Sequence, residues 1–147
     1  MTDAAYYAQE WLRRTDELEQ ERRRALNKCI EIEAQINHCT STFERSGKDP
    51  YLSRAAHEDR LFDYADACER LRMISQRVYA ADTATVEKLE KLRNPVYAAI
   101  LIDRYINRLS WAAIEKLYKK EYSKSAIFEN HRRALDALGH IIGVNVV

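Results

Sequence analysis

Apolar residues recur at helical spacing along most of the chain, and few helix breakers interrupt them. Residues 3–45 contain no Gly or Pro, so we expect one long helix there. Two rows of apolar or small residues follow a heptad repeat in this segment: Leu18, Ala25, Ile32 and Cys39, and Cys29, Ile36 and Phe43. Such rows are typical of a helix that packs lengthwise on another helix. Arg22 falls in the second row and interrupts it.

Residues 46–50, Ser-Gly-Lys-Asp-Pro, form the clearest break in the pattern. Glycine suits the end of a helix and proline prevents its continuation. A second helix is expected from a cap at Ser53 to about Ala80, with the apolar row Leu61, Ala65, Cys68, Leu71, Ile74 and Val78. Two long helices joined by a short loop usually fold back as an antiparallel hairpin. Because each seam is narrow, we expect the hairpin to pack on a second copy or on the C-terminal part.

Capping residues divide the rest of the chain into shorter helices. We expect helices over about 82–93, 95–107, 111–120 and 124–138, and the signals are Asp82 or Thr83, Asn94 before Pro95, Ser110, Ser123, and Gly139 as a C-terminal glycine. The apolar tail 140–147 is not assigned to an element. The predicted fold class is all-α: a long, coiled-coil-like helical hairpin over residues 1–81, followed by a small helix-turn-helix domain over residues 82–147.

Composition narrows the function classes. The chain has only 3 Gly and 2 Pro, and 32% of its residues are charged. No apolar run is long enough for a membrane span, and no signal peptide is recognisable, so we expect no membrane partner and a cytoplasmic location. Residues 94–147 hold 8 Lys/Arg against 5 Asp/Glu, whereas residues 1–93 hold 16 against 18. This mild asymmetry favours the C-terminal part as a nucleic-acid-binding face.

Residues that could carry catalytic or metal chemistry show no matching pattern. The 3 cysteines lack C-x-x-C spacing, and their positions in apolar rows indicate buried side chains rather than a zinc site. His131 lies on the apolar face of the last helix, and the other histidines (His38, His57 and His140) have no partners at metal-ligand spacing. No phosphate-binding glycine loop or nucleophile elbow is present. We therefore expect no enzyme activity, no metal and no cofactor.

The last two helices and the turn between them form the candidate functional region. The final helix places Ile127, His131, Ala134 and Leu138 on one face, and the other face carries Lys124, Ser125, Phe128, Glu129, Arg132 and Arg133. A capped helix with an apolar back and a polar front, preceded by another capped helix and a short turn, suits the major groove of DNA. Lys119, Lys120 and Tyr122 lie in the turn, where they could contact phosphate.

The C-terminal region also resembles a known family. The residues that carry the resemblance are Arg93-Asn94-Pro95, Ile100-Leu101, Arg104-Tyr105-Ile106, Leu109-Ser110-Trp111, Ile114, Ser123, Ile127 and Arg132-Arg133-Ala134-Leu135. This pattern resembles the promoter-reading region 4 of sigma factors, and it is most similar to small phage-encoded regulators associated with activation of late genes. The resemblance implies that Lys124, Ser125, Phe128, Glu129 and Arg132 face the bases. Where the family usually has glycine before Leu-Ser-Trp, this chain has Arg108, and the turn before Ser123 is longer.

Three functional hypotheses follow. The first is a phage or prophage transcription activator that binds double-stranded DNA and acts with RNA polymerase in a bacterial host cell. Its hairpin would either form a homodimer, as we expect of the chain, or touch the polymerase. The second is a DNA-packaging protein of the small-terminase type, which would form a ring of eight or more subunits. The third is a protein-interaction module that binds polymerase or a sigma factor without reading DNA.

Overall fold

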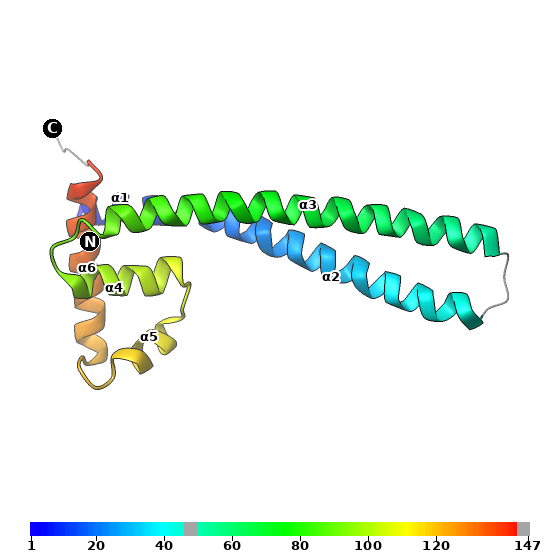
Figure 1. Cartoon of the computed structure of the whole chain (residues 1–147). Coiled ribbons are helices and arrows are strands. Elements are labelled where there is room, and N and C mark those ends of the chain that lie inside the picture. The colour runs from blue at the N-terminus through cyan, green and yellow to red at the C-terminus, as the bar shows by residue number, and fades with distance from the viewer. Residues whose placement is uncertain (46–49, 144–147) are drawn as a thin grey trace. The chain divides into compact units, whose positions relative to one another are not determined.

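The protein is all-α, as the sequence predicted. The computed structural model describes residues 1–45 and 50–143, and the side chains of these ranges except those of 39–45 and 50–53. No strand occurs in the described ranges. The elements are α1 (Asp3–Arg13), α2 (Asp16–Arg45), α3 (Pro50–Leu89), α4 (Pro95–Leu101), the π-helical turn η1 (Ile102–Ile106), α5 (Trp111–Tyr118) and α6 (Lys124–Ile141) (Figure 1).

The chain forms two compact units. Unit 1 contains residues 1–15 together with the chain from Ala80 onward, and unit 2 contains residues 16–79. Within the described residues, no helix is long and apolar enough to cross a membrane. Residues 1–15, which we expected to belong to the hairpin, are therefore part of the same unit as the predicted helix-turn-helix.

The long N-terminal helix predicted over residues 3–45 is interrupted at Arg14 and Thr15, so this prediction was wrong. The Arg14 guanidinium lies over the Trp11 ring, 3.8 Å from its centroid, and donates to the Trp11 carbonyl at 2.7 Å. It also donates to the Thr85 hydroxyl at 3.2 Å. These contacts stabilise the end of α1, which also buries Leu12 in unit 1.

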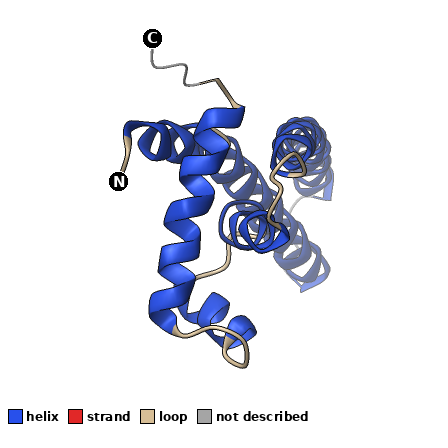
Figure 2. Cartoon of the chain, turned by 90° about the vertical axis from the view of Figure 1, so that its left-hand side faces the viewer, coloured by secondary structure: helices blue, strands red, loops and turns tan. Residues whose placement is uncertain are grey.

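Helix α1 packs closely on α6, and a glycine makes this possible (Figure 2). A Cβ added at Gly139 would lie 2.2 Å from the carbonyl oxygen of Ala4 and 2.6 Å from its carbonyl carbon. Gly139 is thus an interior position of α6, not the C-terminal glycine that the sequence suggested, and α6 continues to Ile141. Gly143, with a φ of 87°, is the residue beyond the helix end that adopts the left-handed conformation.

Helix α3 continues without a break to Leu89, so the short separate helix expected from Asp82 or Thr83 does not exist. Asp82 and Thr85 both have partners that suit the interior of a helix. Thr85 donates to the Ala81 carbonyl at 2.8 Å, and Asp82 forms an ion pair with Arg108 at 3.4 Å. The change from unit 2 to unit 1 at Ala80 therefore occurs inside a continuous helix.

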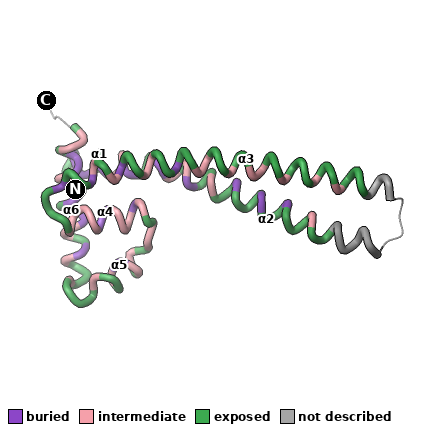
Figure 3. Tube along the Cα trace, viewed as in Figure 1, coloured by how far each residue is buried: buried purple, intermediate pink, exposed green. Residues whose placement is uncertain are grey.

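Unit 2 is an antiparallel hairpin of α2 and the first part of α3 (Figure 1). The heptad rows face inward on α2 up to Ile36, while Cys39 and Phe43 lie outside the described side chains. Arg22 is accommodated at the seam because it donates to both carboxylate oxygens of Glu19, at 2.7 and 2.8 Å. Among the described side chains of this unit, few apolar ones are buried (Figure 3): Ala25, Cys29, Ile32 and Val78.

The core of unit 1 joins α1, the end of α3, α4, η1 and α6. Its buried members are Ala5, Ala8, Leu12, Leu89, Leu92, Leu101, Tyr105, Ala134, Leu135 and Leu138. The predicted start of α4 is confirmed, because the Asn94 side chain accepts from the Val96 N–H at 2.9 Å and Pro95 occupies the first turn. The helix then widens into η1, whose last turn is closed by the Asn107 N–H donating to the Ile102 carbonyl.

Candidate nucleic-acid interface

Helices α5 and α6 begin at the two serine caps that the sequence predicted. The Ser110 hydroxyl accepts from the Ala113 N–H and the Ser123 hydroxyl from the Ala126 N–H, each at 3.2 Å. The turn between the helices is closed by the N–H groups of residues 121 and 122, which both donate to the Tyr118 carbonyl. These local bonds fix where the first turn of α6 starts and leave it at the surface.

The inner face of α6 is buried as predicted. Ile127, His131, Ala134 and Leu138 are all buried, and so is Leu135, which widens the apolar stripe. Ile114 of α5 is fully buried as well. Because α6 is held along its whole inner face, its outer face is fixed in direction.

A cluster of aromatic rings lies beneath the first half of α6. The Trp111 ring lies 4.8 Å from the ring of Phe128 and 4.6 Å from that of His131. The Arg104 guanidinium stacks on Trp111, 4.9 Å from its centroid. Tyr105 is buried, and its hydroxyl lies 2.9 Å from His131 Nε2. These rings are packing residues of the domain, as expected for His131 from its place on the apolar face of the last helix.

The environment of His131 keeps its imidazole neutral. Burial, together with the positive charges of Arg104 and Arg13, lowers the pKa of His131 to about 4. The Tyr105 hydroxyl accepts from Gln9 of α1 at 3.4 Å and also lies within hydrogen-bond distance of the imidazole. The side chains of three elements thus meet in one buried polar chain.

The first turn of α6 presents the most accessible of the predicted base-reading residues. Lys124 and Ser125 are both exposed. The Lys124 ammonium lies 3.7 Å from the Glu115 carboxylate of α5, and the Lys124 side chain is still 71% exposed. Phe128 is 37% exposed, but its ring contacts Trp111. Phe128 therefore has a packing role in addition to any role at the surface.

Glu129 pairs with both arginines of the predicted interface. It forms ion pairs with Arg132 and Arg133 on the same helix, the latter at 3.1 Å. All three side chains are more than a third exposed, so each pair contributes about 1 kcal/mol or less. Glu129 reduces the positive charge of this part of α6, and a phosphate group could replace it as the partner of either arginine.

The predicted turn residues differ in exposure. Lys119 and Lys120 are exposed, whereas Tyr122 is half-buried with its ring 6.4 Å from that of Tyr118. The Tyr118 hydroxyl donates to Asp103 at 2.7 Å, and burial followed by this hydrogen bond raises its pKa well above the ordinary value. Tyr122 therefore helps to shape the turn, and Lys119 and Lys120 are the exposed cationic side chains of this turn.

A surface groove of about 540 Å³ runs between α5 and α6 and was not predicted. It is lined by Ala112, Glu115, Lys116, Lys119, Tyr122, Ser123, Lys124 and Ile127. The small side chain of Ala112 and the turn leave this space, and three lysines surround it. Sequence reasoning missed Lys116 because it lies in the last turn of α5 rather than in the loop that follows.

Arg108, which precedes α5, has a left-handed backbone with a φ of 56°. This is the position where the sigma-like pattern usually has glycine, and glycine adopts this conformation without strain. Here the Arg108 guanidinium donates to the Ile106 carbonyl at 2.9 Å and pairs with Asp82 at 3.4 Å. The ion pair links the turn before α5 to α3 within unit 1.

The described part of the chain offers no cluster of side chains that could bind a metal ion. No group of three or more His, Cys, Asp or Glu side chains that could hold a metal ion occurs there. No model of a known protein family matches the chain, and neither does any curated protein or solved structure. The features of the chain that bear on function are therefore the geometry of α5 and α6 and the residue pattern around them.

Proposed function

We propose that this protein is a sequence-specific DNA-binding transcription regulator that inserts α6 into the major groove of double-stranded DNA. The observation that carries the proposal is a rigidly supported helix with an exposed polar first turn. Helix α6 is capped by Ser123 and buried along its inner face, while Lys124 and Ser125 are exposed. The ends of such helices reach base edges in the groove.

The structure favours a division of roles among the candidate residues. Lys124 and Ser125 stand at the start of α6, where base contacts are made in helix-turn-helix proteins. Lys119 and Lys120 are exposed in the turn, and in this proposal they contact phosphate. Arg132 and Arg133 lie two turns further along α6, where phosphates would compete with Glu129 for them.

The resemblance to sigma region 4 and to phage late-gene regulators supports a role at a promoter, together with RNA polymerase. In this proposal unit 1 binds DNA and unit 2 contacts a protein. The proposal predicts that transcription from a target promoter depends on both units, and that no reaction is catalysed.

The first experiment selects a binding site from a library of random duplexes and then measures affinity by fluorescence anisotropy. Changing Lys119, Lys120 and Lys124 together to Ala should weaken binding at least tenfold, and it should reduce the salt slope by about 2–3. The matched control changes Lys88, Lys91 and Arg93 to Ala, which removes the same charge from another part of unit 1. No binding to any duplex at low salt would refute the proposal, and an equal loss in the control would refute the assigned face.

A second experiment separates base reading from general attraction. Ser125→Ala and Lys124→Ala should reduce the preference for the selected site over random DNA, because each good base contact discriminates by about 1–3 kcal/mol. Lys120→Ala should weaken binding to both DNAs by the same factor. If all three variants lower both affinities equally, α6 does not read bases.

A further inference from the structure

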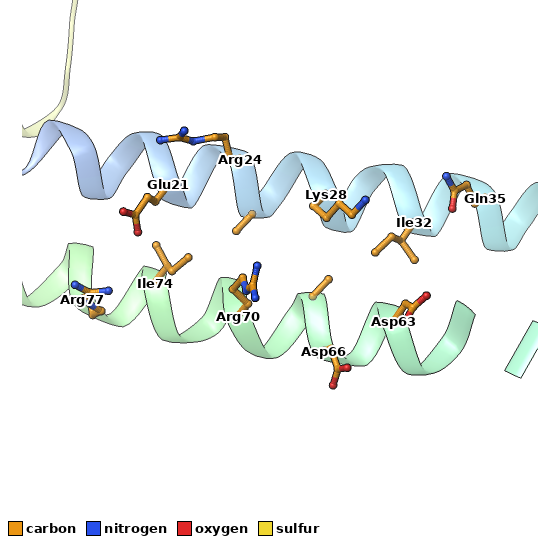
Figure 4. Close-up of a pocket in the computed structure, with 12 residues that line it drawn as sticks. Glu21, Arg24, Lys28, Ile32, Gln35, Asp63, Asp66, Arg70, Ile74 and Arg77 are labelled. Carbon is orange, nitrogen blue, oxygen red and sulfur yellow. The ribbon is translucent and has the colours of Figure 1, made fainter. Parts of the chain in front are cut away.

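The hairpin of unit 2 carries a long groove between α2 and α3, about 710 Å³ in volume. Its floor consists of small or apolar residues from both helices: Ala25, Ile32, Ala67 and Ile74. Figure 4 shows Ile32 and Ile74 pointing into the space between the two helices, with charged side chains along both sides. The small alanines leave the helices open to a close approach by another helical surface.

Opposite charges occupy different stretches of this groove. Arg24, Arg70 and Arg77 line one stretch, and Asp63 and Asp66 line the other, with Lys28 across from Asp66, as Figure 4 shows along the two ribbons. Glu21 is the single acidic residue at the basic end. Because α2 and α3 are antiparallel, both helices contribute to the basic stretch, and the groove as a whole is polarised lengthwise.

Most of these charges have no ion-pair partner among the described residues. Asp63, Asp66, Arg70 and Arg77 form none, although charges elsewhere on the same helices pair readily. Glu69 pairs with Arg72 at 2.6 Å, and neither of these two residues lines the groove. Lys28, which also lines the groove, pairs with Glu31 at 3.9 Å, so the unpaired charges of the lining are chiefly those on α3.

Exposed large apolar side chains lie on α3 beside both charged stretches. Phe62 is 70% exposed and Met73 is 54% exposed. They are four residues before and seven residues after Asp66, so all three share one face of α3. This combination of a polarised charge pattern and neighbouring large apolar residues is suited to a protein surface of complementary pattern.

We propose that a second copy of this chain binds at this groove, and that it uses the same surface of its own unit 2. The twofold axis would pass between Arg70 and Asp66, with the two hairpins antiparallel. This register brings Asp63 and Asp66 of each copy opposite Arg24 and Arg70 of the other. Each copy thereby supplies both halves of the charge pattern, as an isologous interface requires. The inference concerns unit 2 alone and does not depend on DNA binding by unit 1.

The test measures the mass of the full chain in solution, without DNA, by light scattering and sedimentation. The wild-type chain, 17.2 kDa as a monomer, should be found at twice that mass. The variant Asp63→Lys/Asp66→Lys should be a monomer, and so should Arg24→Glu/Arg70→Glu. The four substitutions together exchange the charges across the interface and should restore the dimer. The control Glu33→Lys/Glu58→Lys, which adds the same charge at exposed positions outside the groove lining, should remain a dimer.

Circular dichroism distinguishes a folded monomeric variant from an unfolded one. None of the four groove substitutions removes an ion pair of the described structure, so helical content should match that of the wild type. A wild-type monomer at up to about 200 µM would overturn the proposal. So would a dimer that survives either double charge reversal, a ring of higher order, or a folded fourfold variant that remains monomeric. Retention of DNA binding by the monomeric variants would separate this result from the fate of the DNA-binding proposal.

Discussion

The contact of α1 with α6 through Gly139 can be tested by a single added methyl group. In the middle of an exposed helix, Gly→Ala stabilises by about 1 kcal/mol. Here the new Cβ would lie 2.2 Å from the Ala4 carbonyl oxygen, far inside any permitted contact, so α1 has to move away from α6. Gly139→Ala should therefore destabilise unit 1 despite its better helix propensity.

The magnitude follows from what α1 buries. Detaching α1 exposes the methyl groups of Ala4, Ala5 and Ala8 and the side chain of Leu12. At about 0.8 kcal/mol for each methyl group and about 2 kcal/mol for a leucine, the loss is about 4 kcal/mol. After subtraction of the helix-propensity gain, and with partial relaxation, we expect a net destabilisation of about 2–3 kcal/mol.

Both tryptophans of the chain, Trp11 and Trp111, lie in unit 1. Urea unfolding followed by tryptophan fluorescence therefore reports on this unit specifically. Gly143→Ala is the control, since an added Cβ there meets nothing within 4 Å; its cost is limited to backbone strain of about 1 kcal/mol. Adding Ala4→Gly to Gly139→Ala should give no rescue, because the two shortest contacts are to backbone atoms of Ala4. A Gly139→Ala protein as stable as the wild type would refute the packing of α1 on α6.

Three further changes probe the rest of unit 1. The folded-state pKa of His131 is about 4, whereas its ordinary value is 6.5. The contribution of His131 to the free energy of unfolding should therefore be constant above pH 6.5 and fall by about 2 kcal/mol as the pH drops from 6.5 to 4. Urea midpoints should show this decline, and His131→Gln should remove it. Arg108→Ala keeps the left-handed backbone and loses the ion pair with Asp82, so it should lower the free energy of unfolding by about 1–2 kcal/mol. Arg108→Gly should recover about 1 kcal/mol of that loss, because glycine adopts this backbone without strain. Equal stability of the two variants in thermal melts would show that the backbone at residue 108 is not strained. Tyr105→Phe removes the hydroxyl that links Gln9 to His131 and should lower the free energy of unfolding by about 1–3 kcal/mol, and an unchanged value would show that the buried bonds are not formed.

The features predictable from the sequence are those that depend on near neighbours. The caps Asn94, Ser110 and Ser123 each bind an N–H two or three residues away, so the short helices of unit 1 could be placed. The inner face of α6 followed from periodicity. The pairing of Glu129 with Arg132 and Arg133 was also accessible, since the spacings are three and four residues.

The features that escaped prediction depend on distant parts of the chain. Nothing near Arg14 marks the end of α1, because the bend is stabilised by Thr85 and by the surface of α6. Gly139 resembles a helix terminator until Ala4 is known to lie against it. Asp82 resembles a cap, yet its partner Arg108 holds it in the interior of α3. In each case a tertiary contact determined the outcome, which local propensity does not encode.

The division of the chain has a consequence for the order of folding. Unit 2 is inserted between the first 15 residues of unit 1 and the remainder of that unit. During synthesis the hairpin is complete well before α6 exists, so α1 remains without its packing partner until nearly the whole chain is made. Once formed, the antiparallel hairpin brings the ends of its own segment together and removes most of the loop-closure entropy that separates α1 from the rest of unit 1. Substitutions that weaken the hairpin should therefore slow the assembly of unit 1, even where they leave its final stability unchanged.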